Sequence, residues 1–147
     1  MRISAYESRE RFDEWFASVD MGFLHSFDGE LVGHTSFLNH RPDDRSVEIG
    51  NTWVVPSAWG TGANTEAKFL LMQHAFEDEG LFRVEFKTDA RNDRSRGALA
   101  ALPASFEGVH RKHMLVRGGE RRDSAWYSVI DDEWPVVKAE LQQRLRR

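Results

Sequence analysis

Apolar and polar residues follow two periods along the chain, one typical of strands and one typical of helices. Stretches with alternating apolar positions or many β-branched and aromatic residues predict six strands, over 21–27, 31–38, 46–55, 82–89, 106–116 and 122–130. Apolar residues spaced three and four apart predict four helices, over 8–19, 62–79, 92–102 and 133–145. Strands therefore alternate with helices in the middle of the chain and form hairpins on either side.

The order and the turns of these elements predict a topology. Asp28-Gly29 and Gly118-Gly119 are turn sequences typical of hairpins, which pair their strands antiparallel. The strand–helix–strand unit over 46–89 implies one parallel pair. We therefore expect an α/β fold with a mixed, largely antiparallel sheet flanked by helices. No linker or repeat interrupts the chain, so residues 1–147 are expected to form a single domain.

Composition narrows the function. The chain has no cysteine, which excludes disulfides and cysteine nucleophiles. The N-terminus is charged and no apolar run is long enough to span a membrane, so we expect a cytoplasmic protein without a membrane partner. A net charge of −4 argues against broad nucleic-acid binding. His110 and His113 lie three apart on a predicted strand, so we expect them to face opposite sides and predict no metal site.

The segment "VPSAWGTGANTEAKFLL" over 55–71 is a glycine-rich turn between a strand and a helix. The first N–H groups of a helix have no partner within the helix and attract anions, and Gly60 and Gly62 would let a ligand approach the backbone. The spacing matches neither a Walker loop nor G-x-G-x-x-G. From spacing alone, an anion cradle and a tight connection without a ligand are both open.

Three segments in order resemble a known family: "VEIGNTWVVPSAWGTGANTEAKFLLMQHAFE" (47–77), "RVEFKTDARNDRSRGALAAL" (83–102) and "RDSAWYSVIDDEW" (122–134). The chain from residue 31 onward is similar to the GNAT superfamily of N-acetyltransferases. The nearest branch includes the ribosomal-protein N-terminal alanine acetyltransferases. The first segment resembles the family's pyrophosphate-binding turn, and the second resembles its strand followed by Asn-x-x-Ser at the start of a helix.

This resemblance implies a GNAT-like fold and an acetyl-CoA cosubstrate, from which an acetyl group passes to a primary amine by direct attack on the thioester. The amine would belong to a protein N-terminus or a small molecule. The pyrophosphate would lie in the turn, and the pantetheine arm between strands 46–55 and 82–89. The implied contacts to coenzyme A come from Val54, Val55, Trp59, Gly60, Thr61, Gly62, Ala63, Asn64, Asn92 and Ser95.

The resemblance also suggests catalytic residues. Glu48 is the candidate base, since strand alternation directs it with Gly50 and Thr52 to the face opposite Val47; the alternative is a carboxylate on the strand face with a surface partner. Ser95 could protonate the leaving thiolate, whereas helix capping is the alternative for Asn92 and Ser95. Tyr127 is a second candidate acid, with a core position as its alternative.

Two of the departures from the family pattern bear on the proposed site, one in the glycine-rich turn and one at the N-terminal end. Trp59 replaces the usual Gln or Arg of the turn, and Asn64 replaces Gly or Ala. Members of the family also have a strand and a helix that precede the counterpart of the predicted helix 8–19. This chain has no counterpart of that strand and helix, so we expect strand 21–27 to have an unpaired edge. Dimerisation through that edge, an open acceptor pocket, or a non-catalytic acyl-CoA-binding or interaction module would follow. A toxin-type acetyltransferase acting on charged tRNA is a further alternative, disfavoured by the acidic net charge.

Overall fold

The structure, a computed structural model, describes residues 21–146, so the helix predicted over 8–19 lies outside the described residues. The strands are β1 (Met21–Phe27), β2 (Glu30–Arg41), β3 (Ser46–Val54), β4 (Arg83–Asp89), β5 (Ser105–Leu115) and β6 (Arg121–Ile130). The helices are α2 (Ala63–Gln73), which continues into the π-helical turn η3 (His74–Asp78), α3 (Asp93–Ala101) and α4 (Trp134–Leu145). Short 3-10 turns lie at η2 (Pro56–Ala58) and η4 (Arg117–Gly119). All the strands and helices predicted within the described residues are present, with ends shifted by a few residues.

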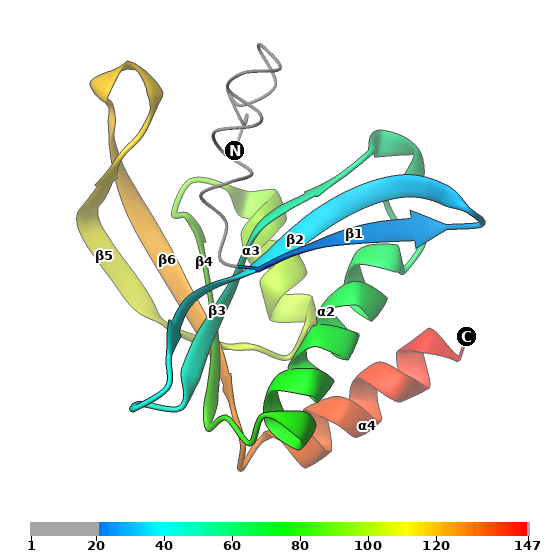
Figure 1. Ribbon diagram of the computed structural model, residues 1–147. Coiled ribbons are helices and arrows are strands. Elements are labelled where there is room, and N and C mark those ends of the chain that lie inside the picture. Colours follow the sequence, from blue (N-terminus) through cyan, green and yellow to red (C-terminus); the bar gives the residue numbers. More distant parts are fainter. Residues whose placement is uncertain (1–20, 147) are drawn as a thin grey trace.

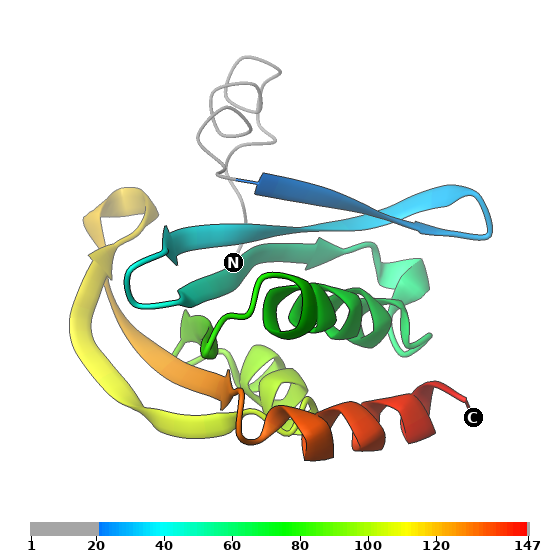
Figure 2. The ribbon, with the colours of Figure 1, turned by 60° about the horizontal axis from the view of Figure 1, so that its bottom comes forward.

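The six strands form one sheet in the order β1-β2-β3-β4-β6-β5 (Figure 1). Only β3 and β4 run parallel, and all other neighbours are antiparallel. The crossovers β3–α2–β4 and β4–α3–β5 step across the sheet in the same direction. Because such crossovers are right-handed, both helices lie on one face, where α4 joins them (Figure 2). The predicted mixed, largely antiparallel α/β sheet is confirmed.

The hydrophobic core fills the space between the sheet and these three helices. The strands contribute Val47, Ile49, Val84, Phe86, Ala125 and Val129, and the helical segments contribute Phe69, Met72, Ala75, Phe76, Leu99, Val137 and Leu141. Trp134 packs against the ring of Phe76 with ring centroids 5.2 Å apart, which fixes the start of α4 against η3. The opposite face of the sheet presents polar and charged side chains from β3, β4 and β6.

A β-bulge in β3 changes which side chains face the helices. Between the pairs His34–Trp53 and Ser36–Gly50, β3 has one residue more than β2. Asn51 absorbs the extra residue with a φ of 49°, which asparagine tolerates better than most residues. The bulge interrupts the alternation, so Thr52 points toward α2 and accepts a hydrogen bond from Lys68. The prediction that Thr52 shares a face with Glu48 is therefore wrong.

The parallel ladder between β3 and β4 is short. Its three pairs join Ser46–Glu48 to Arg83–Glu85, although β3 continues to Val54 and β4 to Asp89. Beyond Glu48, each of the two strands still pairs with its outer neighbour, β2 or β6. The facing backbone N–H and C=O groups of β3 and β4 are thus left without partners across the ladder.

Lys68 is the buried charge on the helical side of the sheet. Its side chain leaves α2 for the interior, where Nζ donates to Thr52 Oγ1 at 3.1 Å and Thr52 Oγ1 lies 2.8 Å from Thr35 Oγ1. Burial lowers the pKa of Lys68 from 10.5 to about 8, because the ammonium loses its hydration. The charged form of Lys68 therefore opposes folding.

We expect Lys68→Met to change how stability depends on pH. Between pH 8 and 10.5 the unfolded chain binds more protons at Lys68 than the folded chain, so the wild type gains stability as the pH rises through this window. The pH-dependent part approaches roughly 3 kcal/mol. Urea unfolding at pH 7.5 and pH 10.5 should show the variant's advantage shrinking at the higher pH, and a difference that stays constant would contradict the assignment.

Candidate active site

Glu48 lies beside the last pair of the β3–β4 ladder, on the face of the sheet opposite α2, α3 and α4. We call it the open face because no helix of residues 21–146 covers it. Its side chain is 2% exposed, and its Oε2 accepts hydrogen bonds from Asn39 Nδ2 and Lys87 Nζ, both at 2.7 Å. Oε1 faces the backbone of Gly50, where a built Cβ atom would lie 3.2 Å from it. One oxygen is thus fixed by donors, and the other is directed at the segment where β3 leaves β4.

Three side chains lie close to the ring of Trp126 in β6, next to this carboxylate. Lys87 Nζ lies 5.4 Å from the centre of its ring, and the rings of His110 and His113 lie 5.0 and 5.5 Å from it. The two histidines therefore share a face, and the prediction that they face opposite sides is wrong. The reason is a bulge between His110 and Met114, in which Lys112 adopts a φ of 49°.

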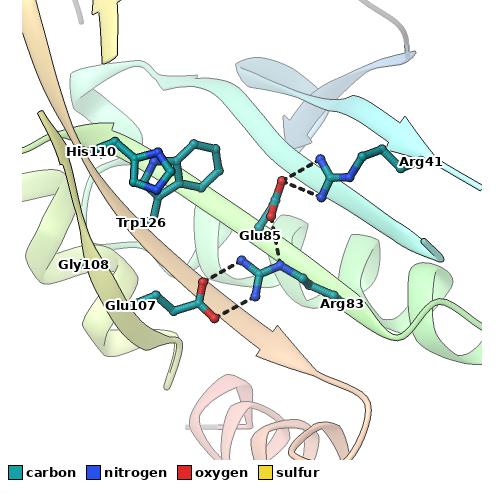
Figure 3. A pocket seen from close by; sticks show the side chains of 7 residues that line it. All are labelled: Arg41, Arg83, Glu85, Glu107, Gly108, His110 and Trp126. Carbon is teal, nitrogen blue, oxygen red and sulfur yellow. Dashed lines mark hydrogen bonds and ion pairs between the residues drawn. The ribbon is translucent and has the colours of Figure 1, made fainter. Parts of the chain in front are cut away.

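A pocket of about 290 Å³ opens beside Trp126 on the same face (Figure 3). Glu85 accepts hydrogen bonds from Arg41 at 3.0 Å and from Arg83 at 2.9 Å. The other edge of the Arg83 guanidinium binds both oxygens of Glu107, at 2.7 and 2.6 Å. These bonds lower the pKa of Glu107 to about 2, so the pocket wall is a network of alternating charges at neutral pH.

The glycine-rich turn has the geometry of an open cradle at the start of α2. Gly60 and Gly62 have φ values of 74° and 87°, which glycine adopts without strain, and no atom lies within 4 Å of a Cβ built on either. Thr61 Oγ1 donates to the carbonyl of Ala58 at 2.8 Å and accepts from the N–H of Ala63 at 3.3 Å, which holds the turn. The buried Oδ1 of Asn64 has no hydrogen-bond partner among the described residues. The open space at the two glycines leaves room for a ligand at this turn, whereas Asn64 Oδ1 is an acceptor and suits a donor rather than an anion.

The end of β3 is already engaged by its own chain. The indole Nε1 of Trp59 donates to the carbonyl of Val54 at 2.9 Å, and the N–H of Val55 donates to the carbonyl of Val32 at 2.8 Å. A ligand arm between β3 and β4 would therefore use the backbone groups before Val54, or displace the indole. Val54 and Val55, which are predicted to contact coenzyme A, thus lie where such an arm would enter between β3 and β4.

The start of α3 brings Asn92 and Ser95 together. Asn92 is the N-cap, and its Oδ1 accepts from the backbone N–H of Ser95 at 3.1 Å. Tyr127 is a core residue 4% exposed, and its hydroxyl accepts a hydrogen bond from Arg96 at 3.1 Å. The capping role of Asn92 and the core position of Tyr127 are thus present in the structure, and the functional roles of Asn92, Ser95 and Tyr127 stay predictions.

Comparison with known proteins identifies the family. The acetyltransferase (GNAT) domain family matches residues 2–103. The chain belongs to the GNAT acetyltransferase family. As a member it is an N-acetyltransferase, and the resemblance in its sequence is confirmed.

Relatives of known structure share the fold as well as the sequence. A GCN5-related N-acetyltransferase from Brucella melitensis is 33% identical with a TM-score of 0.83, over 93% of this chain and 65% of that chain. RimJ of Mycobacterium smegmatis, solved in complex with CoA-disulfide, is 30% identical with a TM-score of 0.73, over 86% of this chain and 60% of RimJ. An uncharacterized N-acetyltransferase from Mycobacterium tuberculosis is 28% identical over 73% of this chain and 67% of its own length.

The sequence did not predict a role for several residues that lie near Glu48 and the pocket. Asn39 and Lys87 hold Glu48, and Trp126 lines the pocket. Lys87 and Trp126 lie in the segments that resemble the family, but nothing in those segments assigned them a role. A signal existed in β4, where charged Arg83, Glu85, Lys87 and Asp89 alternate with other residues and so predict one charged face. Within residues 21–146, no group of three or more His, Asp or Glu side chains could hold a metal ion. No helix in that part of the chain is long and apolar enough to span a bilayer.

Proposed function

We propose that this GNAT enzyme transfers the acetyl group of acetyl-CoA to a primary amine by direct attack of the amine on the thioester. The observation that supports it most is the short β3–β4 ladder, which leaves unpaired backbone groups that lead to the open glycine turn at the start of α2. RimJ of Mycobacterium smegmatis, a structural relative, was solved with CoA-disulfide.

In this proposal the pyrophosphate of coenzyme A lies against the backbone from Gly60 to Asn64. The N–H groups of Gly60, Gly62 and Asn64 have no partner among residues 21–146 and are free to donate to it, whereas those of the two intervening residues already have partners within the turn. The N-terminus of α2 favours an anion through its unpaired N–H groups and its dipole. The pantetheine arm pairs with the facing edges of β3 and β4, as an added strand would. This arrangement delivers the thioester toward the point where the ladder ends, next to Glu48.

Glu48 is proposed to accept the proton of the attacking amine, directly at Oε1 or through a water molecule. Lys87 and Asn39 hold Oε2, so the carboxylate has one fixed orientation and one oxygen for proton transfer. Holding amine and thioester together can lower the barrier by several kcal/mol, roughly 7–11 at the upper end. Ser95, in the first turn of α3, is proposed to protonate the leaving thiolate.

The acceptor is proposed to approach from the open face, through the pocket lined by Glu85, Glu107 and Trp126. The resemblance to the branch that includes the ribosomal-protein N-terminal alanine acetyltransferases favours the amine of a protein N-terminus, and a small amine is the other candidate. The carboxylates of the pocket wall are already paired with Arg41 and Arg83, so the indole ring is the feature that suits a cationic or an apolar part of the acceptor. Initial rates with tripeptides that differ in the first residue, compared with simple diamines, would separate these acceptors.

We predict that Glu48→Gln lowers kcat by about a hundredfold or more, since general-base catalysis contributes roughly 10²–10⁴-fold. The amide keeps the shape and the size of the side chain, so the affinity for acetyl-CoA should stay within about twofold of the wild type. Thiol release during acetyl transfer measures kcat, and calorimetric titration measures binding.

Glu77→Gln is the matched control, because Glu77 is also ion-paired, with Lys138 at 2.6 Å, but belongs to η3 and contacts α4 on the helical side of the sheet. It should leave kcat unchanged. If Glu48→Gln also keeps the wild-type kcat, Glu48 is a structural partner of Lys87 and another group takes the proton.

We predict that Gly62→Ala weakens binding of acetyl-CoA by tenfold or more. The left-handed φ of Gly62 costs a non-glycine residue about 1–2 kcal/mol, so alanine would shift the turn and move the N–H groups from the ligand. Gly80→Ala imposes the same strain at a φ of 62°, after η3 and outside the turn. Both variants should lose similar stability in urea, but only Gly62→Ala should lose affinity; equal affinities would argue against the cradle.

A further inference from the structure

Arg94 and Trp59 form a contact across the entrance of the proposed coenzyme site. Trp59 lies just before Gly60, and Arg94 is the second residue of α3. The Cζ atom of Arg94 lies 3.5 Å from the centre of the Trp59 ring, which is a cation–π stack. The contact joins the turn that follows β3 to the first turn of the helix that follows β4.

The ring that carries Arg94 is itself held in place. The indole Nε1 of Trp59 donates to the carbonyl of Val54 at 2.9 Å, so its orientation is fixed relative to the end of β3. Even so, 51% of Trp59 is exposed. Trp59 is therefore not a core residue; its ring is held at one edge and offers an exposed face on which Arg94 stacks.

Arg94 has no ion pair with a described residue, whereas the nearby Arg91 and Arg96 bind other side chains. Arg91 pairs with Asp89 and Glu120, and Arg96 donates to Tyr127 and to the carbonyl of Ala90. Arg94 forms no ion pair and no hydrogen bond with any residue of the described chain, 21–146, and it is exposed.

Stacking on a ring fixes a guanidinium in a particular way. The attraction acts through the flat face of the group, while its five N–H donors point outward in the plane and stay available. The side chain has therefore already lost part of its rotational freedom before any ligand arrives, which lowers the cost of binding an anion. A planar fork of N–H donors matches the oxygens of a phosphate group.

We propose that Arg94, positioned by Trp59, binds a phosphate group of coenzyme A. The assignment rests on the proposed function, because it places one more residue on the same ligand. The cradle supplies partial charges from backbone N–H groups, and Arg94 adds a full positive charge beside it. The phosphate is either one of the pyrophosphate or the 3′-phosphate of the ribose, which the same chemistry would recognise.

The test measures binding of coenzyme A and of dephospho-coenzyme A, which lacks the 3′-phosphate, by calorimetry with wild type, Arg94→Gln and Arg94→Lys. We expect Arg94→Gln to weaken binding of coenzyme A by about tenfold or more, since a lost hydrogen bond to a charged group has that effect. The affinity of Arg94→Lys for coenzyme A should lie between those of the wild type and Arg94→Gln, because lysine keeps the charge but loses the planar fork of N–H donors. If Arg94→Gln weakens both ligands equally, the contact is to the pyrophosphate; if it weakens only coenzyme A, the contact is to the 3′-phosphate.

Two controls separate this contact from general effects of charge and folding. Arg111→Gln removes an exposed arginine of the edge strand β5, with the same change in net charge, and should leave both affinities unchanged. Acetyl-pantetheine, which has no phosphate, should be turned over equally by wild type and Arg94→Gln.

Three results would overturn the proposal: equal affinity of wild type and Arg94→Gln for coenzyme A, an equal loss in Arg111→Gln, or an equal loss of turnover with acetyl-pantetheine. Failure of the wild type itself to bind coenzyme A would instead overturn the proposed function, and this proposal with it. The two failures are therefore distinguishable in the same experiment.

Discussion

The early end of the hydrogen-bond ladder between β3 and β4 is the constraint on which the proposed site depends. A parallel pair inside a sheet normally continues along both strands, because unpaired backbone groups are costly once buried. Here it ends after Glu48 and Glu85, and the bulge at Asn51 bends β3 soon after. The facing backbone groups are then available to a ligand with its own amides, and the same divergence places the glycine turn and the start of α3 on either side of the gap between the strands.

Ion pairs stabilise the charged groups that line the open face. Glu48 is almost fully buried, so its charge requires Lys87 and Asn39. Glu85 is likewise buried between Arg41 and Arg83. Breaking such a pair is costly, whereas its net contribution to stability is small. This pattern is more readily explained by a requirement for fixed charges at defined positions than by a requirement for stability.

The sequence predicted the fold well and the side-chain arrangement of the site only in part. Strand and helix periods, two hairpin turns and one crossover sufficed for the mixed sheet, since these are local signals. The glycine turn was likewise visible, because Gly60 and Gly62 are needed for their positive φ.

What the sequence could not supply were the bulges and the distant partners. Strict alternation placed Thr52 with Glu48 and separated His110 from His113, and positive φ angles at Asn51 and Lys112 reversed both predictions. Neither residue is glycine, and asparagine at position 51 tolerates a positive φ without requiring one, so the local sequence does not predict either bulge. The partnership of Glu48 with Lys87 depends on the register of a parallel pair, and that of Arg94 with Trp59 on where α3 begins; both are set by tertiary packing.

A titration of the isotope-labelled protein with acetyl-CoA, followed by the NMR signals of the backbone amides, tests the central claim most directly. The account predicts saturable shifts that are largest for Gly60 to Asn64 and for the residues of β3 and β4 beyond the end of their ladder. The amides of β5 and of the β1–β2 hairpin should change little. Saturable shifts centred elsewhere, or no saturable shift at all, would contradict the claim that the divergence of β3 from β4 is the coenzyme site.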